Sequence, residues 1–279
     1  MIQDIAPHHL FNQYQPEKKC QPDDLLICAQ EGRLLVSCAR ELRFPHARDI
    51  GPQAAEPCYL FSLDAQDFYL AREEVPAPAG YAYETLRTIR KEKTGGHAAF
   101  FAAYTAAHLV TFYAHNHFCG SCGARTRHSE TERALVCPQC GRIIYPQLIP
   151  AIIAGVIDGD RILLTKYANR DVPFYALIAG FTEIGETFEE CVHREVYEEV
   201  GLHVKNLRYY KSQPWGNVQD ILAGFFCEVD GSREIHRQQD ELKEALWVPR
   251  ESIELQPDDF SLTNEMMQLF KEGREPALS

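Results

Sequence analysis

The stretch Gly180–Leu202, "GFTEIGETFEECVHREVYEEVGL", contains seven carboxylates and one arginine. Thr187 followed three residues later by Glu190 has the spacing of a capping box, which marks the start of a helix. Gly201 is typical of the first residue after a helix, where the backbone turns left-handed. The spacing therefore predicts a helix that begins after Thr187 and ends before Gly201.

Three carboxylates of this helix, Glu195, Glu198 and Glu199, stand at i, i+3 and i+4, where like charges cost a few tenths of a kcal/mol per pair. At 100° per residue they share one half of the helix with its apolar side chains, so we expect all three to lean inward. Those apolar side chains are Phe188, Val192 and Val196. A solvated acidic face is the ordinary alternative, but inward carboxylates need compensation. Mg²⁺ or Mn²⁺ supplies it, because such ions prefer oxygen ligands and bridge to phosphate.

Four cysteines form two C-x-x-C pairs, Cys119 with Cys122 and Cys137 with Cys140, separated by fourteen residues. This spacing predicts a tetrahedral Cys₄ site for one Zn²⁺ per chain, and four protein ligands make the ion structural rather than catalytic. Two redox or buried thiol pairs are the alternative. The remaining six cysteines are scattered among apolar neighbours, which favours core packing.

The 279 residues predict an α+β chain in three parts. Residues 1–92 read as a β-rich domain with two hairpins. Residues 93–147 hold a charged connector, a helix and the cysteine segment, and residues 148–279 mix strands with helices. The formal net charge of −12 disfavours non-specific binding to nucleic acid or anionic membranes. We expect no membrane contact and a cytoplasmic location, because no apolar run is long enough to span a bilayer and the start lacks a basic signal region.

The stretch from Gly180 resembles the Nudix box, G-x5-E-x7-R-E-U-x-E-E-x-G-U with U a bulky aliphatic residue, without a gap. The matching residues are Gly180, Glu186, Arg194, Glu195, Val196, Glu198, Glu199, Gly201 and Leu202. From about residue 97 onward the chain is similar to the NADH pyrophosphatases of that superfamily, in "FCGSCG", "YPQLIP", "SQPW" and "ELKEALW". The resemblance implies an α/β/α Nudix sandwich with a mixed sheet, behind a β-rich N-terminal domain and a zinc ribbon.

The resemblance also implies roles for particular residues. Catalytic metal ions, more than one per site, would be held by Glu195, Glu198, Glu199, Glu241 and the backbone carbonyl of Ala179. Glu198 could instead orient the attacking water. Arg194 would pair with a neighbouring carboxylate and hold its rotamer. Glu186 could either bind a metal ion or take this positioning role.

Substrate contacts are expected at Glu132, Tyr145, Phe181, Gln213, Pro214, Trp215 and Thr263, together with the loop after "SQPW". This loop, Gly216, Asn217, Val218, Gln219 and Asp220, departs from the P-F-P-x-S of the family, which bears on the preference for NADH. Two chains contribute to each site in this family, so a homodimer is implied.

The function implied is metal-dependent hydrolysis of the pyrophosphate of NADH or NAD⁺, giving AMP and a nicotinamide mononucleotide. The same chemistry on ADP-ribose, or on the NAD cap of an RNA, is a close alternative. A zinc-ribbon protein that binds nucleic acid and only senses a nucleotide is a remote one, because the cysteine segment mixes its arginines with acids.

Overall fold

The computed structural model describes residues 1–51, 56–92, 95–168 and 173–277, and these form two compact units. The C-terminal unit comprises Met1, Leu148–Trp215 and Asp220–Ser279, and the N-terminal unit comprises Ile2–Gln147 and Gly216–Gln219. The division between the units falls between Gln147 and Leu148, and the expected domains 1–92, 93–147 and 148–279 stay a prediction. Residues 93 and 94 of the connector lie outside the described residues, so the finer boundary after residue 92 stays a prediction.

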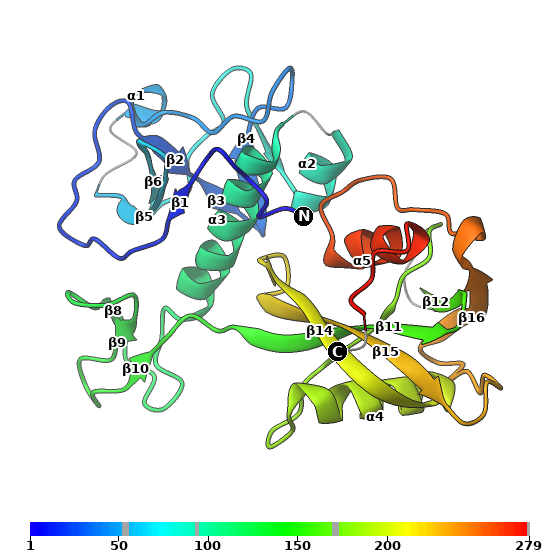
Figure 1. Cartoon of the computed structure of the whole chain (residues 1–279). Coiled ribbons are helices and arrows are strands. Elements are labelled where there is room, and N and C mark those ends of the chain that lie inside the picture. Colours follow the sequence, from blue (N-terminus) through cyan, green and yellow to red (C-terminus); the bar gives the residue numbers. More distant parts are fainter. Residues whose placement is uncertain (52–55, 93–94, 169–172, 278–279) are drawn as a thin grey trace. The chain divides into compact units, whose positions relative to one another are not determined.

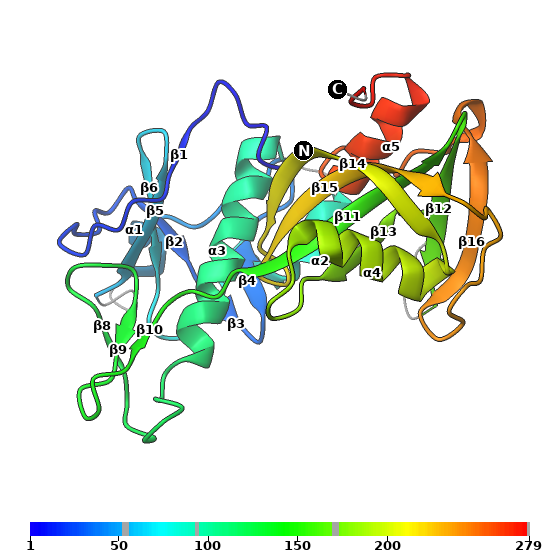
Figure 2. The same cartoon turned by 60° about the horizontal axis from the view of Figure 1, so that its bottom comes forward.

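One mixed sheet forms the centre of the C-terminal unit, with strand order β14-β15-β11-β12-β16 and with β13 paired to β11 (Figures 1 and 2). Strands β11 and β15 run parallel, and the other neighbours are antiparallel. The strand bounds are β11 Ile149–Asp158, β12 Arg161–Tyr167, β13 Ile178–Phe181, β14 His203–Trp215, β15 Asp220–Asp230 and β16 Leu242–Pro249. A mixed sheet is what the resemblance implies.

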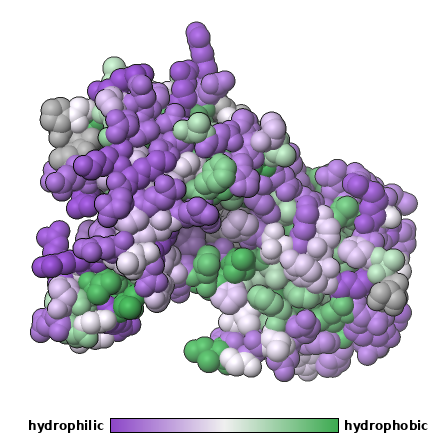
Figure 3. Space-filling model, turned by 60° about the vertical axis from the view of Figure 1, so that its left-hand side comes forward, coloured by the Kyte–Doolittle hydropathy of each residue, from purple (hydrophilic) through white to green (hydrophobic). Residues whose placement is uncertain are grey.

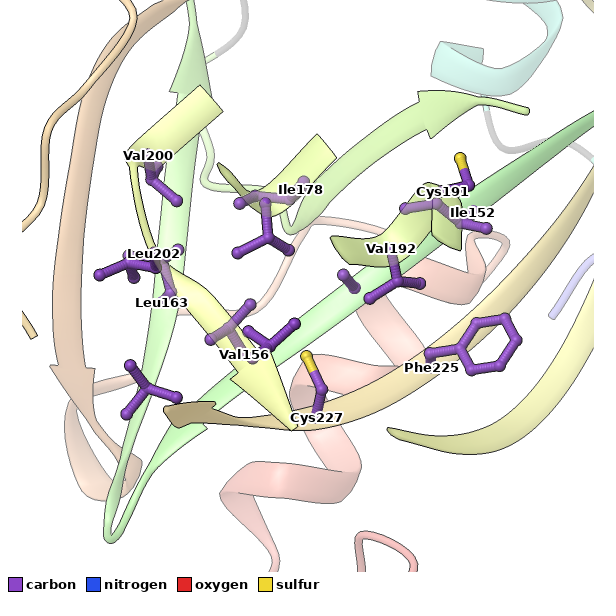
Figure 4. Packing of buried hydrophobic residues seen from close by; sticks show 14 of the residues in the cluster. Ile152, Val156, Leu163, Ile178, Cys191, Val192, Val200, Leu202, Phe225 and Cys227 are labelled. Carbon is purple, nitrogen blue, oxygen red and sulfur yellow. The ribbon is translucent and has the colours of Figure 1, made fainter. Parts of the chain in front are cut away.

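The helices α4 and α5 cover opposite faces of this sheet (Figure 1). Alternate residues of β11 point to opposite faces. Ile152 and Val156 pack with the buried residues of α4, whereas Ile153 and Ile157 pack with those of α5. Figure 4 shows the first of these clusters. The α/β/α sandwich is therefore confirmed. The helical bounds are α4 Phe188–Val200, α5 Leu262–Lys271 and a 3₁₀ turn, η2, at Arg250–Ser252.

The N-terminal unit is rich in short strands and contains one long helix, α3. Its sheets have the strand orders β1-β5-β6-β2, β3-β4-β7 and β10-β9-β8. Both predicted hairpins are present, as β3–β4 and β5–β6. The strands are β1 Leu10–Phe11, β2 Leu25–Ile27, β3 Ala29–Gln30, β4 Arg33–Val36, β5 Cys58–Leu63, β6 Gln66–Leu70, β7 Ala82–Glu84, β8 Arg127–His128, β9 Leu135–Val136 and β10 Ile143–Ile144. The helices are α1 Ala47–Ile50, α2 Leu86–Glu92 and α3 His97–His115.

Hydrophilic residues predominate on the face drawn in Figure 3, where apolar residues form separate smaller areas. Across the part of the chain that the structure describes, no helix combines the length and the apolar character that crossing a membrane requires.

Candidate active site

Helix α4 has the ends that the sequence predicts. The Thr187 hydroxyl accepts a hydrogen bond from the backbone N–H of Glu190, and the Glu190 carboxylate accepts one from the backbone N–H of Thr187. Gly201 adopts a left-handed conformation with φ of 70° and its N–H donates to the Tyr197 carbonyl. These local bonds satisfy the exposed backbone groups at both ends and set the rotation of the glutamates relative to the sheet.

Arg194 connects three carboxylates of the Nudix box. Its Nε and Nη2 donate to the two carboxylate oxygens of Glu186, each at 2.8 Å, which is a bidentate pair. Its Nη1 donates to Glu195 at 2.8 Å and to Glu198 at 3.0 Å, and Nη2 also donates to the Phe181 carbonyl at 2.9 Å. The guanidinium therefore fixes the orientation of these carboxylates relative to the end of β13.

The electrostatics of these groups differ because their surroundings differ. The Arg194 guanidinium lowers the pKa of Glu186 to about 2, so Glu186 is a charged partner of the arginine. Burial raises the pKa of Glu195, an effect that Arg194 opposes and that the charges of Glu198 and Glu241 reinforce. Glu241, which is far away in sequence, therefore lies within electrostatic range of the helix carboxylates.

The expectation that all three helix glutamates lean inward is only partly correct. Glu199 is buried, at 1% exposure, and Glu195 is nearly so, with 13% of its side chain exposed. The Glu198 side chain is 53% exposed, and Phe188 is exposed at the first turn. The buried stripe is narrower than half the helix because the sheet contacts one line of residues, which includes Val192, and leaves its flanks open.

The end of β13 lies directly under this helix. A Cβ atom on Gly180 would lie 1.9 Å from the carboxyl carbon of Glu195, so no larger residue fits there without moving that carboxylate. The preceding residue, Ala179, pairs with Ile153 of β11. Its backbone N–H donates to the Tyr167 hydroxyl at 3.1 Å. The Ala179 carbonyl, Glu195 and Gly180 thus come together at one place.

Glu241 immediately precedes β16, and its backbone carbonyl accepts a hydrogen bond from the N–H of Ala168, after the end of β12. The oxygens of Glu195, Glu198, Glu199 and Glu241 and of the Ala179 carbonyl suit Mg²⁺ or Mn²⁺, which take hard oxygen ligands. The donor set therefore matches the group that the family implies.

The four cysteines converge in the N-terminal unit. The Sγ atoms of Cys119 and Cys140 are 3.7 Å apart, and those of Cys122 and Cys137 are 3.4 Å apart. The donor atoms of these four potential metal ligands all lie within 4.8 Å of one another. Hydrogen bonds from backbone N–H groups, that of Ser121 foremost, lower the pKa of Cys119 to about 6, which favours the thiolate that binds zinc.

The expected substrate residues of the C-terminal unit occupy different environments. Phe181 is exposed beside the box, whereas Gln213 is fully buried. The Gln213 amide donates to the Phe260 carbonyl at 2.7 Å and accepts from the Leu262 N–H at 2.8 Å. Gln213 therefore holds the start of α5, where Thr263 lies partly buried. Three further residues lie along this hairpin: Pro214 is exposed, Trp215 half-buried and Asp220 buried.

The other expected substrate residues belong to the N-terminal unit. The Tyr145 hydroxyl donates to the Glu132 carboxylate at 3.1 Å, so the structure brings these two together. Gly216 is buried against helix α3, where an added Cβ would lie 2.0 Å from the Tyr104 carbonyl oxygen. The next residues form a turn in which Asn217 and Val218 are exposed and Gln219 is half-buried. No local sequence signal predicts that this loop packs on α3.

Comparison with known proteins finds two domain matches. The NUDIX domain matches residues 147–270, and the NADH pyrophosphatase zinc ribbon domain matches residues 114–145. The first match covers most of the C-terminal unit, and the second contains the four cysteines.

Three relatives align over most of their length. The chain is 36% identical over 239 residues to the NAD-capped RNA hydrolase NudC of Pseudomonas aeruginosa strain LESB58, covering 85% of this chain and 81% of the relative. Identity is 35% over 228 residues to the protein of the same name from Pseudomonas syringae pv. syringae strain B728a, with coverages of 82% and 78%. The chain is 32% identical over 228 residues to the protein of the same name from Yersinia pseudotuberculosis serotype O:1b strain IP 31758, with coverages of 82% and 85%. The chain therefore belongs to the Nudix hydrolase family, in the group that carries the NADH pyrophosphatase zinc ribbon.

Proposed function

We propose that this chain hydrolyses the pyrophosphate bond of NAD(H)-type dinucleotides with the help of Mg²⁺ or Mn²⁺. With NADH and one water the products are AMP and reduced nicotinamide mononucleotide. The observations that support the proposal are the close approach of Glu195 to Gly180 at the end of β13, the charge of Glu241 within electrostatic range of Glu195, and the hydrogen bond from Arg194 to Glu195. Membership of the Nudix family supports the same conclusion.

The metal ions would be held by Glu195, Glu199, Glu241 and the Ala179 carbonyl, with Glu198 as a further ligand or as the group that orients water. Divalent ions supply charge neutralisation at the diphosphate and a lower pKa for bound water. The water oxygen forms a bond to phosphorus, the bridging P–O bond breaks, and the water proton passes to a carboxylate. The exposure of Glu198 gives its carboxylate access to solvent, which favours the water-orienting role.

For the nucleotide, exposed aromatic rings offer faces on which a base can stack. Phe181 is exposed directly beside the box, and Tyr145 is exposed with its hydroxyl bonded to Glu132. We propose both aromatics as stacking partners and Glu132 as the residue that orients Tyr145. Thr263 and the residues from Pro214 to Asp220, including Trp215, complete the proposed contacts, while Gln213 acts through the backbone that it holds.

A second candidate substrate is the NAD cap of an RNA, because the relatives carry that activity in their names. The diphosphate that would be cleaved is the same. The net charge of −12 opposes the binding of a long RNA, so we favour the free dinucleotide. ADP-ribose contains the same bond and is the third substrate to compare.

A substrate panel tests the proposal. NADH, NAD⁺, ADP-ribose and an NAD-capped RNA are incubated with Mg²⁺ and with Mn²⁺, and kcat/KM is compared for AMP release or cap removal. Intact NADH after long incubation at high enzyme would refute the first proposal, and a preference for capped RNA would favour the second. Nucleic-acid binding that survives about 200 mM salt without any hydrolysis would instead favour the nucleotide-sensing alternative.

We also propose a homodimer with one structural Zn²⁺ per chain, in a cytoplasmic setting. All ten cysteines are unbridged, which is usual for a reducing compartment. Light scattering after size-exclusion chromatography tests the dimer, which would appear at twice the chain mass of 31.8 kDa.

A further inference from the structure

Tyr167 ends β12 at a point where the strand is irregular. Its register with β16 shifts between Lys166 and Tyr167, and Tyr167 pairs with Leu242. Two residues earlier, the backbones of Thr165 and Ala176 exchange two hydrogen bonds, of 2.9 and 2.8 Å. Beyond these two hydrogen bonds, the side chain of Tyr167 rather than its backbone contacts the segment that leads into β13.

The Tyr167 hydroxyl contacts the backbone at the end of β13. It accepts a hydrogen bond from the Ala179 N–H at 3.1 Å. It also lies within donating distance of the carbonyl oxygens of Ala179 and Leu177, at 3.4 and 3.5 Å. One hydroxyl therefore restrains the peptide groups on both sides of the Ala179 Cα atom.

The backbone at the end of β13 also lies close to helix α4. The Glu195 carboxylate occupies the space where a Cβ on Gly180 would lie. The Ala179–Gly180 peptide is thus bounded by the Tyr167 hydroxyl and by the Glu195 carboxylate, both of which have defined positions. A shift of this peptide would move the Ala179 carbonyl relative to Glu195.

The same end of β12 also restrains Glu241. The N–H of Ala168, the residue after Tyr167, donates to the Glu241 carbonyl at 2.8 Å, and Tyr167 pairs with Leu242, the residue after Glu241. Two metal-ligand candidates that lie outside α4, Ala179 and Glu241, are therefore positioned by one short segment.

We propose that Tyr167 is a positioning residue of the divalent-cation site, whose hydroxyl holds the Ala179 carbonyl in place while its backbone holds the start of β16. This inference rests on the proposed function, since it concerns the same metal site. No local sequence pattern indicates it, because Tyr167 and Ala179 meet only through the packing of β12 against β13.

The test compares wild type with Tyr167→Phe, which removes one oxygen and keeps the ring. Binding of Mn²⁺ without substrate is measured by the electron paramagnetic resonance signal of the free ion. We expect the Mn²⁺ affinity to fall by about tenfold, the lower end of the effect of residues that orient metal ligands. Activity should fall at low Mn²⁺ and recover at saturating Mn²⁺, which a general loss of stability would not produce.

Tyr175→Phe is the matched control. Its hydroxyl donates to Glu244 at 2.8 Å in the same unit and contacts none of the proposed ligands, so Mn²⁺ binding should stay at the wild-type value. Mn²⁺ affinity of Tyr167→Phe within about twofold of wild type would overturn the inference. Because binding is measured without substrate, a wild-type protein that binds Mn²⁺ but leaves NADH intact refutes the proposed substrate alone.

Discussion

The substitution Gly180→Ala tests the position of the Glu195 carboxylate, because it should displace this group with little effect on the stability of the fold. The added Cβ would lie 1.9 Å from the Glu195 carboxyl carbon and 2.1 and 2.3 Å from its oxygens. The ordinary contact distance begins at 3.4 Å, so the carboxylate must move by about 1.5 Å, the difference between 3.4 and 1.9 Å. A carboxylate at the far end of a flexible side chain can make this move, and the backbone of Gly180 needs no left-handed conformation.

The expected effect is therefore large on catalysis and small on folding. Misplacing a reacting group by about 1 Å costs on the order of 100-fold in rate. We expect Gly180→Ala to lower kcat at least about 100-fold, which corresponds to about 2.7 kcal/mol of transition-state stabilisation. The melting temperature should change little, because the added methyl group meets the far end of one flexible side chain and no packed core residue.

The assay measures kcat with NADH and saturating Mn²⁺, beside the melting temperature. Gly155→Ala is the control, since its Cβ would lie 2.9 Å from the buried Phe226 ring, away from the box. Such overpacking costs about 1–3 kcal/mol of stability, so this variant should melt earlier and keep its kcat. If Gly180→Ala turned over at the wild-type rate, the close approach of Glu195 to β13 would have no catalytic meaning.

Three further predictions concern the box and the ribbon. Glu199→Gln should lower kcat by about 10³-fold. The melting temperature should not fall, because a neutral isostere replaces a buried charge. Wild-type kinetics would exclude Glu199 as a ligand. Arg194→Gln should destabilise the fold by about 2 kcal/mol at neutral pH, because a bidentate ion pair is lost. The folded-state pKa of Glu186, about 2, is below its unfolded value of 4.5, so this stabilisation is present above about pH 4.5 and fades toward pH 2; unfolding curves that differ equally at pH 2.5 and 7 would contradict it. Cys137→Ser should reduce bound zinc from about one equivalent to less than half, measured by elemental analysis, and a full equivalent in the variant would exclude the Cys₄ site.

Local signals predicted the parts of this protein whose structure depends on residues close in sequence. The ends of α4 follow from Thr187, Glu190 and Gly201, because caps form between residues three to five apart. The two cysteines of each C-x-x-C pair are brought together by a tight turn closed by a glycine with positive φ, Gly123 or Gly141. In both cases hydrogen bonds within a few residues determine the local geometry, whereas the approach of the two cysteine turns is a tertiary contact.

The tertiary structure alone decided which acidic side chain is buried and what restrains the site. Glu198 and Glu199 are neighbours, yet the sheet covers the second and leaves the first in solvent. Gln213, which the resemblance places among the substrate contacts, is buried and holds the start of α5 through two hydrogen bonds. The contact of Tyr167 with Ala179 depends on how β12 diverges from β11 and on the insertion of β13. Such contacts join residues brought together by packing of the sheet, and the side-chain pattern of each segment contains no record of its partner.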